Sequence, residues 1–279
     1  MPHGRISPGK VNAGINAIWN SLTAEKKEYG GIFMIKIGVS GARGRMGQRI
    51  IALARQDSTF KVSFGLEADT HPDAGQIIDN LMIASDPAYI ENCECLIDFS
   101  SPSATANYLS HLVAQKKKAV IGTTGFSREE YAKISQAAKE TAILCSPNMS
   151  IGVNLLFRLV KESAAVLKGY KTHIEEIHHV HKKDAPSGTA KRIGNILSGL
   201  GFPVKDSDID ALRIGEVIGD HKVRFESGVD KIELFHSAKT RDIFAQGALV
   251  AAKWLHQKKT GLYTMEDVLF HQDKGKETK

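Results

Sequence analysis

The feature that most limits the fold of this chain is a glycine-rich turn between a predicted strand and a predicted helix. The apolar run 35–39 is followed by Gly41, Gly44 and Gly47, and an amphipathic stretch at 46–55 continues from there. Glycine allows a tight turn and a close approach of the backbone to a pyrophosphate, and the start of a helix favours an anion. The GxxGxxG spacing departs from the commoner GxGxxG, so the strand and helix context, more than the motif, predicts a dinucleotide site.

A carboxylate at the end of the next predicted strand strengthens this interpretation. Glu67 lies 20 residues after Gly47, where an acid that hydrogen-bonds the adenosine ribose is expected. Because a carboxylate there repels a 2′-phosphate, Glu67 followed by Ala68 favours NADH. Arg43 and Arg45 could each reach a 2′-phosphate, so the use of NADPH as well as NADH stays open.

From Met34 onward, short apolar runs alternate with amphipathic stretches, which is the pattern of a doubly wound parallel sheet. The predicted strands are 35–39, 61–66, 95–99, 119–121 and 143–145. Helices are predicted at 46–55, at 104–114, and from a capping box of Ser127 and Glu130 to about Glu140.

The character of the sequence changes after Pro147, where a second domain is expected to begin. Its predicted elements are helices at 153–167 and 190–197 and strands at 172–177, around Leu212, at 223–225 and at 232–235, and a further helix is predicted after them at 241–255. These strands predict a mixed or antiparallel sheet. The expected organisation is an N-terminal extension without function at 1–33, a dinucleotide-binding domain at 34–149 and 241–279, and a substrate-binding and oligomerisation domain at 150–240.

The stretch that carries the most chemistry is EEIHHVHKKDAPSGTA at 175–190. It holds His178, His179, His181, Lys182 and Lys183 within six positions. Imidazole is the natural proton donor near neutral pH, and an ammonium group can hold an anionic substrate or offset developing negative charge. The cluster therefore suits a reduction that is coupled to protonation.

An anion site is predicted directly after this cluster. Pro186 and Ser187 are residues that start helices, and the N–H groups of Gly188 and Thr189 at such a start can bind a carboxylate. The hydroxyls of Ser187 and Thr189 are expected to add donors. A proton donor and an anion site are thus adjacent in the sequence.

Composition argues against several other functions. The net charge of +6 comes with short basic runs that lack interleaved aromatics, so a small acidic molecule is favoured over nucleic acid as the partner. No run is apolar for long enough to span a membrane. Cys93, Cys95 and Cys145 lack the spacing of a zinc site or a disulfide framework, which favours a reducing, cytoplasmic location. No histidine spacing supports a metal site, so no metal is expected.

The stretch at 175–190 closely resembles the HHxHKxDAPSGTA signature of dihydrodipicolinate reductases. GARGRMG at 41–47, DFS at 98–100, GTTG at 122–125, SPNMSIGVN at 146–154, GDHKVRF at 219–225 and FAQGALVAAKWL at 244–255 resemble that family in the same order. The first 33 residues match nothing in it. The resemblance implies a Rossmann-type doubly wound parallel sheet with a smaller α+β domain that is built on a mixed sheet.

The resemblance also implies a reaction, which is the NADH- or NADPH-dependent reduction of 4-hydroxy-tetrahydrodipicolinate (dihydrodipicolinate) to tetrahydrodipicolinate on the diaminopimelate route to lysine. His178 would be the proton donor and Lys182 the second catalytic group. His179 would contact the dicarboxylate substrate, and Gly188 with Thr189 would bind its carboxylate. The implied cofactor-binding residues are Gly41, Ala42, Arg43, Gly44, Arg45 and Met46 for the pyrophosphate, Glu67 for the ribose, and Gly122, Thr123, Thr124, Ser146, Pro147, Asn148 and Met149 beside the nicotinamide.

Two further points follow from the resemblance. It implies a homotetramer built through the sheets of the second domain. Many members carry Arg directly after the ribose-binding acid, where this chain has Ala68, and this difference again favours NADH.

Two other functions stay open from the residues alone. One is another imine or amino-acid dehydrogenase such as an aspartate dehydrogenase, against which DAPSGTA argues. The other is a catalytically silent dinucleotide sensor, which would keep the glycines and Glu67 but would need neither His178 nor Lys182.

Overall fold

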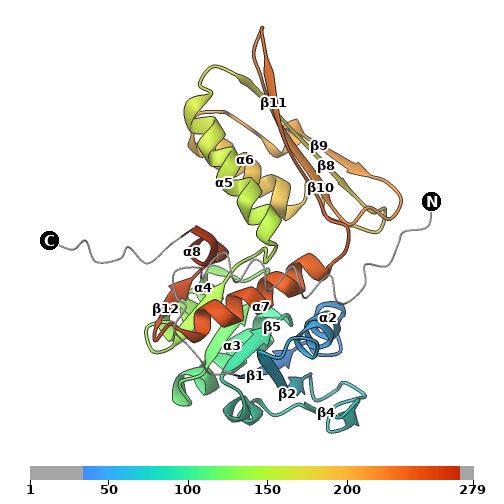
Figure 1. The fold of residues 1–279 in the computed structure, drawn as a ribbon, viewed down its shortest axis with the longest axis vertical. Helices are drawn as coiled ribbons and strands as arrows, with labels where there is room; N and C mark the ends of the chain where they lie inside the picture. Colours follow the sequence, from blue (N-terminus) through green and yellow to red (C-terminus); the bar gives the residue numbers. More distant parts are fainter. Residues whose placement is uncertain (1–33, 271–279) are drawn as a thin grey trace, which may run out of the picture. The chain divides into compact units, whose positions relative to one another are not determined.

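An eight-stranded, mostly parallel sheet forms the core of the first of two units in this protein (Figure 1). The computed structural model describes residues 34–270, which divide into one unit of 34–149 with 244–270 and a second unit of 150–243. The N-terminal extension expected at 1–33 and the last residues, 271–279, lie outside the described residues.

The order of strands in the first sheet creates a switch point. The strands are β1 (Ile35–Ser40), β2 (Phe60–Leu66), β3 (Ile77–Ile78), β4 (Leu81–Ala84), β5 (Cys95–Asp98), β6 (Lys118–Ile121), β7 (Ala142–Cys145) and β12 (Gly261–Tyr263). They lie in the order β12-β7-β6-β5-β1-β2-β4-β3, and all neighbours except β3 and β4 pair in parallel. The winding therefore reverses between β1 and β5, and ligands of such sheets bind at the carboxyl ends of the strands at this point.

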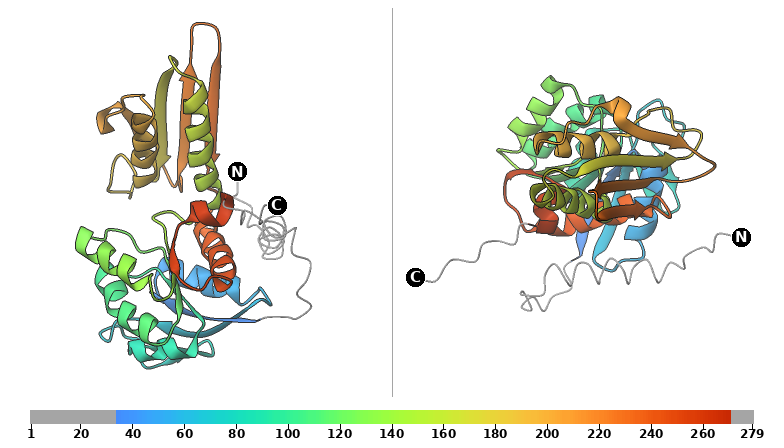
Figure 2. Two further views of the ribbon diagram at one scale, coloured as in Figure 1. Left: turned by 90° about the vertical axis from the view of Figure 1, so that its left-hand side faces the viewer. Right: turned by 90° about the horizontal axis from the view of Figure 1, so that it is seen from above.

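Helices cover both faces of this sheet. They are α2 (Arg45–Ala54), α3 (Pro102–Ala114), α4 (Arg128–Ala137), α7 (Asp242–His256) and α8 (Met265–Phe270), with a 3-10 helix η1 (Pro87–Asn92). The left view of Figure 2 shows α3 and α4 on one face and α2 and α7 on the other. Right-handed crossovers that run in opposite directions from the switch point place their helices on opposite faces. The predicted doubly wound parallel sheet is confirmed.

The predicted elements of this unit are found within a few residues of their expected positions. The capping box is present, because Ser127 Oγ accepts the N–H of Glu130 and the Glu130 carboxylate accepts the N–H of Ser127. The helix that it begins ends at Ala137, before the predicted end at Glu140. Strands β3, β4 and β12, which are two to four residues long, were not predicted.

The second unit is a four-stranded mixed sheet with two helices. Its elements are α5 (Ile151–Val166), β8 (Lys171–His178), α6 (Gly188–Gly199), a 3-10 helix η2 (Asp206–Asp208), β9 (Ile209–Arg213), β10 (Asp220–Glu226) and β11 (Lys231–Ser237). The strands lie in the order β11-β10-β8-β9, with β8 and β9 parallel and β10 antiparallel to both β8 and β11. The expected mixed sheet is therefore confirmed.

One face of this second sheet packs on α5 and α6. Its apolar core includes Ile174 of β8, Val223 and Phe225 of β10, and side chains from both helices. Because side chains alternate along a strand, Glu176 and His178 lie on the same face as Ile174. Both are buried, so the core of this unit continues directly into its polar site.

The other face of the second sheet carries charged side chains and an exposed ring. Lys222 Nζ lies 2.8 Å from Glu175 Oε1, and His173 Nε2 lies 2.8 Å from Asp210 Oδ2. Phe235 of β11 is 62% exposed. Figure 2 shows the β10–β11 hairpin standing beyond the ends of α5 and α6.

Two expectations from composition can be compared with the structure. Among residues 34–270, no helix is both long and apolar enough to cross a membrane. Cys93, Cys95 and Cys145 are buried free thiols. Burial raises the pKa of Cys93 to about 12 and that of Cys145 to about 11, so these thiols stay protonated near neutral pH.

A buried ion pair joins α7 to the first crossover of the sheet. Lys253 Nζ donates to Asp57 Oδ2 at 2.8 Å across 196 residues of sequence, and the two side chains are only 2% and 4% exposed. Burial would raise the pKa of Asp57, but hydrogen bonds from Lys253 and Thr59 outweigh burial and hold that pKa below its ordinary value. The ionised pair therefore helps to hold α7 against the rest of the first unit.

Lys253→Met is expected to destabilise the protein strongly, because it leaves the Asp57 carboxylate buried without its cation. Breaking a buried pair in this way costs about 3–5 kcal/mol. The matched control is Lys116→Met, which removes an exposed pair with Glu140 at 3.2 Å and should cost less than about 1 kcal/mol. Urea unfolding at pH 7, followed by circular dichroism, measures both.

The loss of stability caused by Lys253→Met should depend on pH. Since the pKa of Asp57 is lowered in the folded protein, the stability from this pair is present above the ordinary carboxyl pKa and is lost as the pH falls through the folded value. The difference between wild type and Lys253→Met should therefore shrink as the pH falls below about 4. Equal costs for Lys253→Met and Lys116→Met at pH 7 would contradict the assignment.

Candidate active site

The glycine-rich turn follows β1 at the switch point of the first sheet. Gly41 has a φ of +69°, and the N–H groups of Gly41 and Ala42 donate to Leu66 O at 3.0 and 3.3 Å. A methyl group on Gly47 would lie 2.7 Å from the Cα of Ala42, so glycine is needed for α2 to begin this close to the turn. Gly44 caps α2 without a side-chain hydrogen bond. The start of α2 thus fits the pyrophosphate of a dinucleotide.

Glu67 and Arg43 both have hydrogen-bond or ion-pair partners beside this turn. Glu67, directly after β2, accepts the N–H of Arg43 on Oε1 at 2.6 Å, so the expected ribose-binding acid touches the glycine-rich turn. The guanidinium of Arg43 pairs with Asp73, with 2.5 Å between Nε and Oδ2. The sequence left Arg43 open as a contact for a 2′-phosphate, but sequence reasoning did not single out Asp73, which holds this side chain.

A buried carboxylate ties together the loops after β5 and β6. Asp98 is 1% exposed and accepts the hydroxyl and the N–H of Ser100 at 2.5 and 3.1 Å. Its backbone carbonyl accepts the N–H groups of Gly122 and Thr123 at 2.9 and 3.2 Å. Burial raises the pKa of Asp98, although the hydrogen bonds oppose this shift. The DFS motif therefore organises the neighbouring GTTG loop.

The residues expected beside the nicotinamide follow two neighbouring strands. Gly122, Thr123 and Thr124 come directly after β6, and Ser146, Pro147, Asn148 and Met149 come directly after β7. The carboxyl ends of parallel strands meet at one edge of a sheet, so these residues share an edge with the glycine-rich turn. Thr124 and Pro147 are exposed there, whereas Thr123, Ser146 and Met149 are buried. The structure thus gathers the predicted cofactor residues at one edge.

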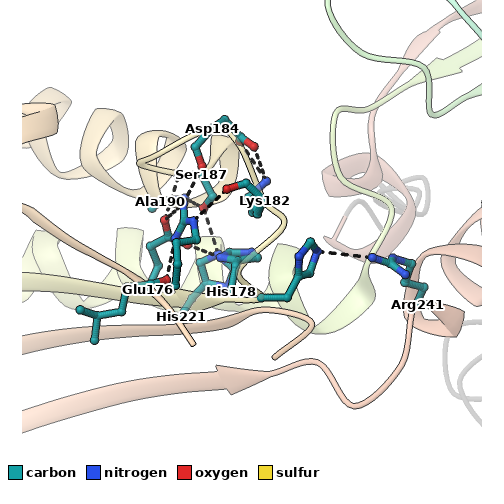
Figure 3. Close-up of polar contacts among 11 residues, drawn as sticks. Glu176, His178, Lys182, Asp184, Ser187, Ala190, His221 and Arg241 are labelled. Atoms are coloured by element: carbon teal, nitrogen blue, oxygen red, sulfur yellow. Dashed lines mark hydrogen bonds and ion pairs between the residues drawn. The ribbon is translucent and has the colours of Figure 1, made fainter. Parts of the chain in front are cut away.

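In the second unit, His178 ends β8 and is held by a buried carboxylate (Figure 3). Glu176 Oε2 is paired with His178 Nδ1, while Glu176 Oε1 accepts the N–H of Ser187 at 3.1 Å and Arg213 Nη2 at 2.9 Å. Glu176 has no exposed surface. Burial would raise its pKa, but the hydrogen bonds of His178 and Arg213 outweigh burial and lower it to about 2. Glu176 is therefore ionised at neutral pH.

The start of α6 lies beside this carboxylate. Ser187 caps the helix, and its Oγ accepts the N–H of Ala190 at 3.2 Å. Ser187 is 2% exposed and its Oγ lies 3.3 Å from His221 Nε2. The Ser187 hydroxyl was expected to add a donor for a substrate carboxylate, whereas in the structure it supports the helix start. Gly188 and Thr189 occupy the first turn, where the helix dipole favours an anion.

The other members of the histidine and lysine cluster are divided between the site and the surface. Lys182 Nζ donates to both carboxylate oxygens of Asp184, at 2.7 and 2.9 Å. His179 Nε2 lies 3.5 Å from Arg241 Nη2, and burial followed by the charge of Arg241 lowers the pKa of His179. His181 is 74% exposed at its side chain, so it stands apart from the buried group.

A different set of residues has the spacing of a metal site. One ligand atom from each of Glu176, His178 and His221 lies within 4.8 Å of the others, whereas the sequence had offered only His178, His179 and His181. Both oxygens of Glu176 already have protein partners, including the guanidinium of Arg213. Burial, and then the charge of His178, lower the pKa of His221 to about 3. This donor set fits an internal hydrogen-bond network better than a cation.

Sequence reasoning missed the residues that surround His178 from other strands. In the sheet, His178 of β8 stands opposite Arg213 of β9, and Glu176 stands opposite His221 of β10. Glu176 had one signal in the sequence, since it lies two positions before His178 and therefore on the same face of the strand. His221 lies within the GDHKVRF segment that resembles the family, but no sequence signal placed His221 or Arg213 beside Glu176, because those positions depend on strand register.

These two units define a class of protein. A glycine-rich turn at the switch point of a doubly wound sheet, with a carboxylate after the second strand, is typical of a nicotinamide-dependent oxidoreductase. The second unit adds a buried histidine beside the start of a helix, and both are groups that a substrate domain can use.

Known proteins that match this chain identify the family. Residues 35–149 match the family model described as dihydrodipicolinate reductase, N-terminus, and residues 152–269 match the one described as dihydrodipicolinate reductase, C-terminus. The chain belongs to the dihydrodipicolinate reductase family, as the sequence motifs indicated, and members of this family use NADH or NADPH.

Individual relatives agree with this assignment. The 4-hydroxy-tetrahydrodipicolinate reductase of Aquifex aeolicus (strain VF5) is 42% identical over 264 residues, which cover 84% of this chain and 98% of the relative. The enzyme of the same name from Geotalea daltonii is 38% identical over 264 residues, covering 85% and 99%. The dipicolinate-bound dihydrodipicolinate reductase from Paenisporosarcina sp. TG-14 has the same fold, with a TM-score of 0.73, 21% identity and coverage of 85% and 100%.

Proposed function

We propose that this protein catalyses the NADH- or NADPH-dependent reduction of 4-hydroxy-tetrahydrodipicolinate to tetrahydrodipicolinate on the diaminopimelate route to lysine, with His178 as the proton donor. Membership of the family and the names of relatives that match over nearly their whole length support the reaction. The observation that carries the mechanism is the pairing of His178 with the buried Glu176 beside the start of α6.

The residues of the second unit provide sites for an anionic substrate. The first-turn N–H groups of Gly188 and Thr189 bind one carboxylate. Lys182 uses two of its three N–H donors on Asp184, which leaves a donor for the second carboxylate. His179 contacts the substrate, and Arg241 beside it adds positive charge. Two carboxylates thus meet two separate sets of donors.

His178 performs the proton step. When bound, a reduced nicotinamide supplies the hydride. Lys182 offsets negative charge that develops on the substrate, while His178 delivers a proton from Nε2 to the position next to the reduced carbon. Its Nδ1 is occupied by Glu176, so Nε2 is the atom that can face a substrate.

The cofactor residues of the first unit have corresponding roles. Gly41, Ala42, Arg43, Gly44, Arg45 and Met46 cradle the pyrophosphate, Glu67 holds the ribose, and the loops 122–124 and 146–149 line the nicotinamide side. This assignment is supported by the close approach of Gly47 to Ala42 and by the position of Glu67 beside the turn.

The first experiment is a coupled assay. Purified protein should oxidise NADH or NADPH only while a synthase generates the substrate from pyruvate and aspartate semialdehyde. His178→Gln should lower kcat roughly 100-fold to 10 000-fold, the usual contribution of a proton donor, while the Kd for the cofactor stays within about twofold. His181→Gln, at the exposed histidine, is the control. Cofactor binding without synthase-dependent oxidation would contradict the proposed reaction.

We infer a preference for NADH from the neighbours of Glu67. Its carboxylate lies against the N–H of Arg43, and the Arg43 guanidinium is paired with Asp73 at 2.5 Å. A 2′-phosphate would meet the negative charge of Glu67 and would have to draw Arg43 away from Asp73. Ala68 adds no positive charge at this place.

Asp73→Asn should shift the preference toward NADPH, because it removes the carboxylate that holds Arg43. The ratio of kcat/KM for NADPH to that for NADH is expected to rise about tenfold. This factor corresponds to the free energy of one charge-assisted hydrogen bond. Asp69→Asn removes a nearby exposed charge as a control. The inference is wrong if both variants change the ratio equally or if neither changes it.

We also propose that the protein is a cytoplasmic homotetramer built through the open face of the second sheet. That face carries the exposed Phe235 beside paired charges such as Lys222 and Glu175, a mixture that suits contact with a second copy. The three buried, free cysteines suit a reducing compartment.

Phe235→Glu should reduce the molar mass measured by light scattering, because it places a charge in the proposed interface. The wild type should have the mass of four chains. Ile77→Glu changes an equally exposed apolar side chain of the first unit, where Ile77 is 68% exposed, and should leave that mass unchanged. A monomeric wild type, or an unchanged mass for Phe235→Glu, would exclude this interface.

A further inference from the structure

One buried carboxylate touches both the proton donor and the anion-binding helix start. We propose that Glu176 is a positioning residue for the reaction: it holds His178 with a proton on Nδ1, so that Nε2 is the nitrogen that exchanges protons with the substrate. The proposal rests on the proposed function, in which His178 is the proton donor. Glu176 itself stays ionised and exchanges no proton.

The first step of the argument is the placement of the two oxygens of Glu176. Oε1 accepts two donors, the Ser187 N–H at 3.1 Å and Arg213 Nη2 at 2.9 Å. Oε2 is left for His178 Nδ1. Since an ionised carboxylate can only accept hydrogen bonds, Nδ1 must carry a hydrogen. The ring tautomer is therefore set by Glu176.

The second step is the effect of burial. Glu176 has no exposed surface and His178 is 8% exposed, so solvent does not compete for this contact. Arg213, with 18% of its side chain exposed, balances the charge of Glu176. His221 contacts the His178 ring edge-on, with 5.2 Å between centroids, and burial lowers its pKa to about 3. A neutral His221 leaves Arg213 as the permanent cation beside Glu176.

The third step is the space around Nε2. A methyl group on Gly219 would lie 2.9 Å from His178 Nε2, so the absence of a side chain at this position keeps that nitrogen accessible. The same carboxylate binds the Ser187 N–H, and Ser187 caps α6 directly before Gly188. Glu176 therefore fixes the proton donor relative to the anion site as well as the orientation of the ring.

Replacement of the carboxylate by an amide gives a sharp test. In Glu176→Gln the amide oxygen should remain at the Oε1 position, because Ser187 and Arg213 both donate there. The NH2 group would then face Nδ1 of His178, and Nδ1 would have to become an acceptor. A ring whose only proton is on Nε2 cannot release that proton without becoming an anion. An amide replacement that enforces the wrong tautomer lowers kcat by about four orders of magnitude in serine proteases.

We expect Glu176→Gln to lower kcat by at least about 100-fold, with KM and the Kd for the cofactor changed less than about threefold. The solvent deuterium isotope effect on kcat should rise, because protonation becomes rate-limiting. Partial unfolding would lower kcat without changing this isotope effect. Glu162→Gln is the matched control, since Glu162 forms an exposed pair with Arg158 at 2.7 Å on α5. A Glu176→Gln variant with wild-type kcat or an unchanged isotope effect would overturn the proposal.

Two additions keep the test decisive. The unpaired Arg213 in Glu176→Gln could impair folding, and combining this change with Arg213→Met removes both charges. The proposal expects kcat to remain low in the folded double variant. Recovery of wild-type kcat would overturn the proposal. Solid-state 15N NMR of histidine-labelled protein, with His178→Gln to assign the signal, should show a proton on Nδ1 in wild type but not in Glu176→Gln.

The outcomes also separate this proposal from the proposed function. Absence of synthase-dependent turnover in wild type refutes the proposed function, whereas the 15N spectra still test the tautomer. Turnover that depends on His178 but not on Glu176 refutes only the positioning role.

Discussion

The second unit depends on the burial of one negative charge. An ionised carboxylate that is removed from water costs several kcal/mol unless every oxygen has a partner. Glu176 meets this requirement with donors from three places in the chain: Arg213 of β9, His178 of its own strand, and the N–H of Ser187 before α6. The pairing of β8 with β9 and the placement of α6 therefore serve the same carboxylate, which links the architecture of this unit to its chemistry.

The first unit meets a different requirement, which is to bring several loops together at one edge of its sheet. Parallel strands bring several loops to one edge of the sheet, and the glycine-rich turn exposes the start of α2. The buried Asp98 connects the loops after β5 and β6 through Ser100 and Thr123. These hydrogen bonds hold the two loops together, and loops held in this way lose less entropy when a ligand binds.

Electrostatic neighbours decide how the cationic side chains of both units are used. Arg43 is directed to Asp73, and Lys182 is directed to Asp184. Asp73 lies outside the motifs that the sequence singles out, whereas Asp184 belongs to DAPSGTA, and each carboxylate sets the position of the positive charge that it contacts. The sequence motif identifies a cationic side chain that can bind an anion. The neighbouring carboxylate then determines where that side chain lies.

The sequence by itself determined the features that depend on residues close together in the chain. The glycine-rich turn after an apolar strand, Glu67 at the end of the next strand, and the run from His178 to Thr189 were all identified in this way, as was the order of most helices and strands. Apolar periodicity and helix capping are local properties, so they can be read without a structure.

Only the tertiary structure decided the partners of these groups. Arg213 and His221 meet Glu176 because β9 and β10 pair with β8 in one register, and a shift by one residue would turn them to the other face. Alternating sequences are compatible with several registers, and the choice among them depends on packing and on the burial of charge over the whole unit. For that physical reason, the sequence alone could name His178 as the expected proton donor but could not give the carboxylate network around it.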